Sequence, residues 1–187
     1  MADAKAADMI ETWPAVVRYD GVFDFDGLYK ELIEHLRRHN YWFYETLYKH
    51  KPWSPLGTEL TLKWTAERKL DEYYLNKITF EWHFMDFHHV EVIREGKKVE
   101  LTKAYFWVVI RGEATADWQG FESKSEKKFT KFISKLFREK VIDREFVYDY
   151  YYPLMDEIME IQQIIQQFVN MEASRMDKYE DTKGRIN

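Results

Sequence analysis

Apolar and polar side chains alternate along the middle of the chain with a period of two residues. From residue 60 to 67, and again from 72 to 84, every second side chain is largely apolar. This alternation is typical of strands that bury one face and leave the other in water. The inward residues that it predicts are Leu60, Leu62, Trp64, Ala66, Ile78, Phe80, Trp82 and Phe84.

The sequence predicts further strands on both sides of these two segments. Residues 90–92 and 99–101 flank a turn and predict a hairpin, while the aromatic residues 41–48 favour another strand. The Asp20-Gly21 pair suggests a small hairpin within residues 16–23. The strand that follows the main hairpin is apolar on both faces, so we expect it to lie centrally, either covered on both sides or with one face against a partner. Its two faces are Phe106, Val108 and Ile110 on one side, and Tyr105, Trp107 and Val109 on the other.

A helical period of three and four residues appears in three places. The first helix begins near Phe25, where Asp24 or Asp26 can cap it, and ends at His39-Asn40. Two more helices are predicted at about 124–139 and 144–171, with Pro153 bending or restarting the last. We therefore predict an α+β fold, with an antiparallel meander sheet of four or five strands packed by an N-terminal helix and two C-terminal helices.

The ends of the chain have a different composition from the middle. Residues 1–15 are rich in alanine and are predicted to be flexible, and the charged residues 172–187 are predicted to form a disordered tail. Residues 16–171 then form a single domain, which suits a chain of 187 residues.

Composition limits the possible classes of function. A net charge of −5 gives no general attraction to nucleic acid or anionic lipid, and the absence of cysteine excludes disulfide and thiolate chemistry. No apolar run approaches the roughly 20 residues of a membrane span, and the start lacks the order of a signal peptide. We predict a cytoplasmic protein without a membrane span.

Several short motifs carry a resemblance to a known family. They are Phe25-Asp26-Gly27-Leu28-Tyr29, Ser54-Pro55-Leu56-Gly57, Lys97-Lys98-Val99-Glu100-Leu101-Thr102-Lys103, and the aromatic helix that starts near Asp143. In these stretches the chain resembles an uncharacterised family of small archaeal proteins. The resemblance implies an intracellular, prokaryote-type setting, and it brings no activity or catalytic residue with it.

Histidine is the sharpest candidate for chemistry. His35 and His39 stand four residues apart on one predicted helix and can reach one metal ion, while His83, His88 and His89 lie around Asp86. However, the first two border an apolar face, adjacent strand residues point apart, and nothing in the sequence joins the two groups. We therefore predict no metal and no cofactor.

The helix at about 124–139 carries a basic stripe. Seven Lys and Arg residues lie between positions 124 and 140, enough to attract phosphates, so nucleic-acid binding is possible. The ordinary interpretation is favoured, because an amphipathic helix needs a solvated face and the whole chain is acidic. The stripe consists of Lys127, Lys131, Lys135 and Arg138.

The sequence contains no complete catalytic constellation, so we predict a non-enzymatic binding or protein-interaction module that forms a homodimer or binds another protein. Its expected interface, on the last helix, is Ile158, Ile161, Ile164, Ile165 and Phe168. The alternative is a helix-grip-like domain that binds or turns over a hydrophobic small molecule in an aromatic pocket. That pocket would be lined by Trp82, Phe84, Phe106, Tyr151, His83, His88 and Asp86. A filled interior would support the interaction module, and an open cavity the alternative.

Overall fold

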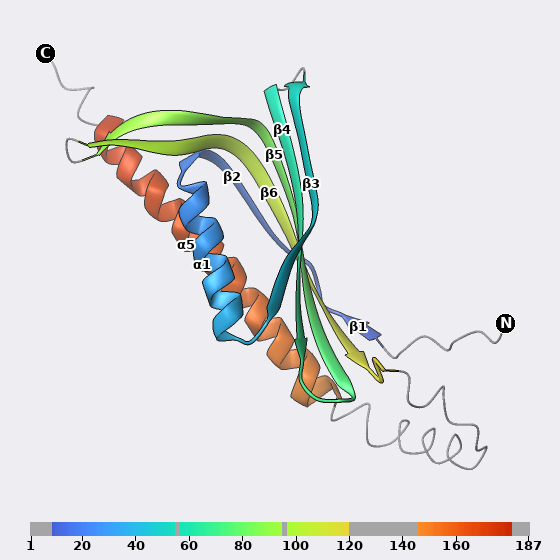
Figure 1. Cartoon of the computed structure of the whole chain (residues 1–187). Helices are drawn as coiled ribbons and strands as arrows, with labels where there is room; N and C mark the ends of the chain where they lie inside the picture. The colour runs from blue at the N-terminus through green and yellow to red at the C-terminus, as the bar shows by residue number, and fades with distance from the viewer. Residues whose placement is uncertain (1–8, 55–56, 95–96, 120–145, 181–187) are drawn as a thin grey trace, which may run out of the picture.

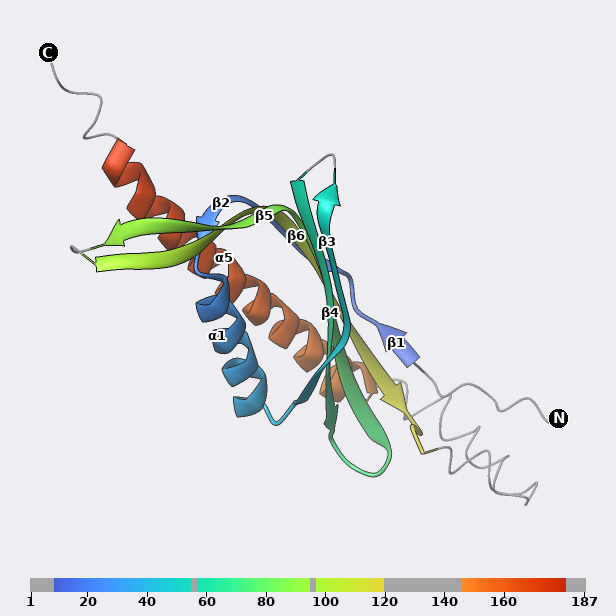
Figure 2. The ribbon, with the colours of Figure 1, turned by 45° about the horizontal axis from the view of Figure 1, so that its top comes forward.

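A curved antiparallel sheet wraps around two helices, and both helices lie on the same side of it (Figures 1 and 2). The structure, a computed structural model, describes residues 9–54, 57–94, 97–119 and 146–180. The predicted α+β class and the antiparallel sheet are confirmed. The sheet has six strands rather than four or five, and the described residues contain two α-helices. The helix predicted at 124–139 lies outside the described residues.

The strands follow the order β1-β6-β5-β4-β3, and β2 also pairs with β6, so β6 lies in the interior of the sheet as expected. Residues Ala15–Phe23 form one continuous strand along β6, and the small hairpin predicted there is wrong. A long pairing with a central strand satisfies more backbone groups than an isolated two-stranded hairpin. The strands are β1 (Met9–Glu11), β2 (Ala15–Phe23), β3 (Trp42–Ser54), β4 (Gly57–Lys69), β5 (Tyr74–Arg94) and β6 (Lys97–Ala116).

A bulge bends the long β5–β6 arm. The register shifts between Met85 and His88, and Asp86 there has a φ of 53°, which is unusual for a residue with a side chain. The extra residue places the ring of Phe87 5.6 Å from that of Phe84 and 5.8 Å from that of Phe25. The bend thus closes the aromatic core above the first helix.

Helix α1 (Phe25–Arg38) has the predicted ends. The Asp24 side chain accepts a hydrogen bond from the Gly27 amide at 2.8 Å, and the chain leaves the helix through Asn40, whose φ is 61°. Leu28, Leu32 and Leu36 are buried against the sheet. This packing fixes the rotation of α1, which decides where its histidines lie.

The C-terminal helix lies across the concave face of the sheet (Figure 1). A π-helical turn, η2 (Phe146–Tyr151), leads into α5 (Tyr152–Glu180), and Pro153 sits in the first turn of α5, where its missing N–H does no harm. Gly112 of β6 allows the close approach, because a Cβ there would lie 2.5 Å from Ile158 Cδ1. α5 continues to Glu180, past the expected boundary at 171, and β1 lies in the segment expected to be flexible.

The core is formed by the concave face of the sheet and the covering faces of α1 and α5. Trp64, Phe80 and Trp82 are at most 1% exposed. No helix within the described ranges is long and apolar enough to cross a membrane.

Candidate functional site

The residues predicted to line an aromatic pocket form a packed interior instead. Trp82, Phe84 and Phe106 are at most 1% exposed, and their ring centroids are 5.4–5.7 Å apart. The indole N–H groups of Trp64 and Trp82 have no hydrogen-bond partner among the described residues, so polar groups do not converge there. The predicted pocket is therefore filled by its own lining. Tyr151 lies apart in η2, where it contacts Tyr152.

The polar residues assigned to the same pocket lie elsewhere. His83 points to the opposite face of the sheet from Trp82, because successive strand residues alternate, and it stacks on Trp107 at 4.9 Å. His88 and Asp86 are exposed at the bulge, where the His88 ring is 2.8 Å from the Asp86 carbonyl oxygen. These residues do not meet Trp82, Phe84 and Phe106 in one site, which corrects the predicted grouping.

The apolar seam of α5 is occupied by the chain's own sheet. Ile158, Ile161 and Ile165 are at most 1% exposed, while Ile164 and Phe168 are partly buried against the same core. Burial removes the first three from any surface that a partner could reach in the folded monomer. A helix that covers a wide concave sheet buries its apolar side chains against that sheet, so the residues predicted as an interface belong to the chain's own core instead.

An apolar surface does remain on the convex side of the sheet. No described helix covers this side (Figures 1 and 2). At its centre is β6, where Tyr105 is 37% exposed and its ring lies 5.9 Å from that of Trp107. Neighbouring strands extend the surface, since Val16 pairs with Val109 and Met85 with Tyr105. We call this surface the outer aromatic face, and it consists of Val16, His83, Met85, Tyr105, Trp107 and Val109.

Charged residues border the outer aromatic face. Glu81 Oε2 accepts a hydrogen bond from Arg111 at 2.7 Å, and its other oxygen accepts one from Lys63 at 3.0 Å. The hydrogen bond from Arg111, followed by that from Lys63, lowers the pKa of Glu81 despite partial burial. On the other edge, Arg18 and Asp20 pair in register with Trp107 and Tyr105. The face thus has an apolar centre and a rim with charges of both signs.

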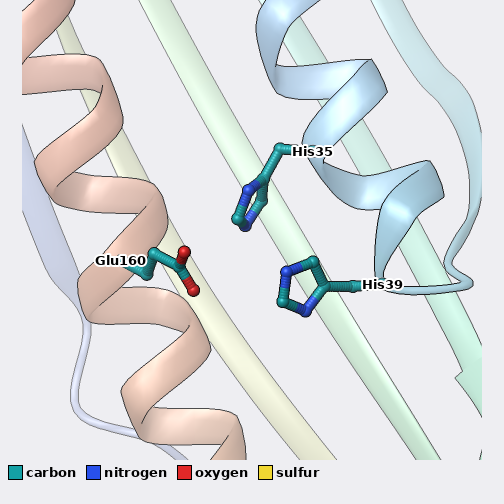
Figure 3. A group of neighbouring side chains, drawn as sticks. All are labelled: His35, His39 and Glu160. Carbon is teal, nitrogen blue, oxygen red and sulfur yellow. The ribbon is translucent and has the colours of Figure 1, made fainter.

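A second polar group lies on the concave side, between α1 and α5. His35 and His39 project from one side of α1 toward Glu160 of α5 (Figure 3). Their rings are 4.5 Å apart, His35 is 5% exposed, and ligand atoms of all three residues lie within 4.8 Å of one another. Burial is the main cause that lowers the pKa of His35; His39 and Arg38 lower it further, while Glu160 and Glu157 oppose them. His35 and His39 therefore do not join His83, His88 or His89.

Glu157 connects this group to the sheet. It accepts a hydrogen bond from the Tyr41 hydroxyl at 2.6 Å and one from Arg68 Nη2 at 2.7 Å, and its Oε1 is 3.9 Å from His39 Nδ1. Burial and the neighbouring Glu157 carboxylate raise the pKa of Tyr41, so this hydroxyl acts as a proton donor in the hydrogen bond. Sequence reasoning missed Glu157 and Glu160, because only the folded chain brings them to α1.

A shallow hollow on the β5–β6 arm is lined by His89, Val90, Glu91, Lys98, Val99 and Glu100, none of which belongs to the predicted pocket. The predicted basic stripe, Lys127, Lys131, Lys135 and Arg138, lies outside the described residues.

No protein-family model matches the chain, and no curated protein matches it significantly.

Proposed function

We propose that the protein is a non-enzymatic interaction module, and that its outer aromatic face binds a second copy of the chain. The observation that carries this proposal is the aromatic pair Tyr105 and Trp107, exposed and half-buried respectively, on the uncovered side of the central strand β6. A contiguous apolar surface with a polar rim has the composition of a protein interface. Strands with one solvated face normally carry polar residues there, so the aromatic residues call for a partner.

The filled interior supports this function over the helix-grip-like alternative. The sheet does curve around a long C-terminal helix, as that alternative expects (Figure 2). Its concave side, however, is occupied by Trp64, Trp82 and Phe106, which are nearly inaccessible to solvent. A hydrophobic ligand would have to displace close-packed rings, at a cost that a preformed pocket avoids.

The charges at the rim favour an identical partner. In a two-fold dimer the same face meets itself, so each charge on one copy needs an opposite charge on the other. The face offers Arg18 and Asp20 along one edge, and Glu81 with Lys63 and Arg111 along the other. Two sheets stacked about 10 Å apart would interdigitate their aromatic columns and place charges of opposite sign together.

Sedimentation equilibrium tests this function. We expect the wild type to be a dimer at tens of micromolar, and the Tyr105→Lys, Val109→Lys double variant to be a monomer with unchanged circular dichroism. The matched control is Leu47→Lys with Tyr48→Lys on the exposed part of β3, which should remain a dimer. A monomeric wild type, or a control as dissociated as the face variant, would contradict the proposal. An unfolded face variant would also reject it, because the face would then belong to the chain's own core.

A further inference from the structure

The cluster between α1 and α5 has the composition of a metal site. Imidazole and carboxylate are the ligands that zinc and related divalent ions use in proteins, and three protein ligands are typical of a site that keeps a water in the fourth position. The sequence offers only His35 and His39, which are four residues apart. The fold adds Glu160, more than 100 residues away, and brings all three ligand atoms within 4.8 Å of one another (Figure 3).

We infer that His35, His39 and Glu160 form a site for one divalent transition-metal ion of the zinc type, which ties α1 to α5. This inference reverses the prediction from sequence that no metal is bound. It is independent of the outer aromatic face, which lies on the opposite side of the sheet.

Core packing on both helices holds the backbone of the site in place. Leu32 and Leu36 of α1 are buried on either side of His35, and Ile158 and Ile161 of α5 are buried on either side of Glu160. An ion would therefore not have to organise the helices before binding. The positions of the ligands are set by hydrophobic contacts that exist without it.

The distances suit the ion after small side-chain rotations. Tetrahedral zinc with ligands at about 2.0–2.1 Å needs ligand atoms about 3.3 Å apart, so no pair has to close by more than roughly 1.5 Å. Glu160 is exposed and unbranched, which allows this movement by rotation of its side chain. His39 is partly exposed, with 35% of its side chain accessible, so an ion can enter from solvent.

Buried His35 lies directly beside His39. Only 5% of the residue is exposed, and its ring centroid is 4.5 Å from that of His39. Two imidazoles this close, one of them shielded from water, supply two of the three protein ligands that an open zinc site needs.

Glu157 lies beside His39, where metal-binding histidines usually have an outer carboxylate, and a small side-chain rotation would bring it within hydrogen-bonding distance. Its Oε1 lies 3.9 Å from His39 Nδ1, which leaves Nε2 of the same ring for the ion. Arg68 and Tyr41 hold this carboxylate from the sheet side. The positive charge of Arg68 is thus paired with Glu157, and the carboxylate of Glu160 remains available for the ion.

Titration calorimetry with zinc chloride tests the site in the full-length chain after treatment with a chelator. We expect one zinc ion per chain, and cobalt substituted for zinc should show the visible absorption of a tetrahedral site. His39→Asn should weaken zinc binding by more than about 100-fold, because loss of an outer partner alone typically costs 10- to 100-fold. Glu160→Gln should weaken it by at least about 10-fold. Both replaced side chains are at least partly exposed, so the variants should unfold near the wild-type temperature without metal.

The matched control is the pair His88→Asn and His89→Asn, which removes two exposed histidines from the β5–β6 arm. It should bind zinc as the wild type does, within about a factor of two. Three results would overturn the inference: no stoichiometric binding by the wild type, unchanged affinity in both site variants, or loss of binding in the control. At the same zinc concentration, zinc should also raise the unfolding temperature of the wild type by more than that of Glu160→Gln.

Discussion

Strand β6 is apolar on both sides, but its two faces have different surroundings. Phe106, Val108 and Ile110 are fully buried on the concave face, whereas Tyr105 on the opposite side is 37% exposed. The side chains on the two faces of β6 are similarly apolar, so residue type alone does not determine which face is buried. What decides it is where the covering helix can approach, and Gly112 opens that approach on the inner face.

The same contrast separates Trp82 from His83 on β5. Trp82 is in the core, whereas His83 stacks on Trp107 outside, although the two are adjacent in the chain. The inner face is buried by helices of the same chain. The outer face is an uncovered apolar surface with a charged rim, which is the composition of a protein interface.

The largest difference should be between the two sides of the sheet themselves. Phe80→Ala should lower the free energy of unfolding by about 3–5 kcal/mol, because Phe80 is fully buried. Trp107→Ala should cost less, about 1–2 kcal/mol, when measured at a concentration where the protein is monomeric, because this ring is only half-buried in one chain. Equilibrium denaturation gives both values, and equal losses would mean that the outer face is also part of the monomer's core.

Removing a charge on the inner side of the sheet should lower the free energy of unfolding more than removing a charge at an exposed hairpin. Glu157→Gln removes the charge that faces Arg68, whose side chain is 17% exposed, so we expect a loss of about 1–3 kcal/mol. The control, Glu91→Gln, removes the partner of Lys98 where both side chains are more than 70% exposed, and should cost less than about 0.5 kcal/mol. A larger loss in the control, measured by urea unfolding, would show that this ranking is wrong.

Apart from the control Glu91→Gln, the smallest effect on stability should come from Glu81 at the rim. Arg111 and Lys63 lower its pKa in the folded chain, so its stabilising effect is present above its ordinary pKa of 4.5 and disappears as the pH falls through the lowered value. Glu81→Gln should therefore cost about 0.2–1 kcal/mol at neutral pH. The difference from the wild type should shrink in acid, and a difference that grows toward low pH would contradict the assigned hydrogen bonds.

Local patterns predicted much of the fold. The spacing of Leu28, Leu32 and Leu36 located α1, and the alternation through Trp64 and Phe80 identified the inward faces of β4 and β5. Such patterns depend on neighbours within one element, and a sequence displays them directly. The long strand β2 was missed because its pairing with β6 joins residues about 90 positions apart.

The candidate sites were harder to predict because they depend on how separate elements meet. The helical spacing of His35 and His39 was visible, but their third partner, Glu160, is brought to them only by the path of α5. The apolar seam through Ile161 was visible too, yet its pattern is the same whether a sheet or a second chain covers it. Only the position of the helix over the sheet separates these two possibilities.

The accessibility of one thiol on the outer aromatic face tests the central claim most directly. Because the chain has no cysteine, Val109→Cys and the control Lys49→Cys on exposed β3 each introduce a unique reactive group. If the face binds a second copy, the labelling rate at position 109 should fall as the protein concentration rises from about 1 to about 100 μM, and the rate at position 49 should stay constant. A rate at position 109 that does not change with concentration would contradict the account.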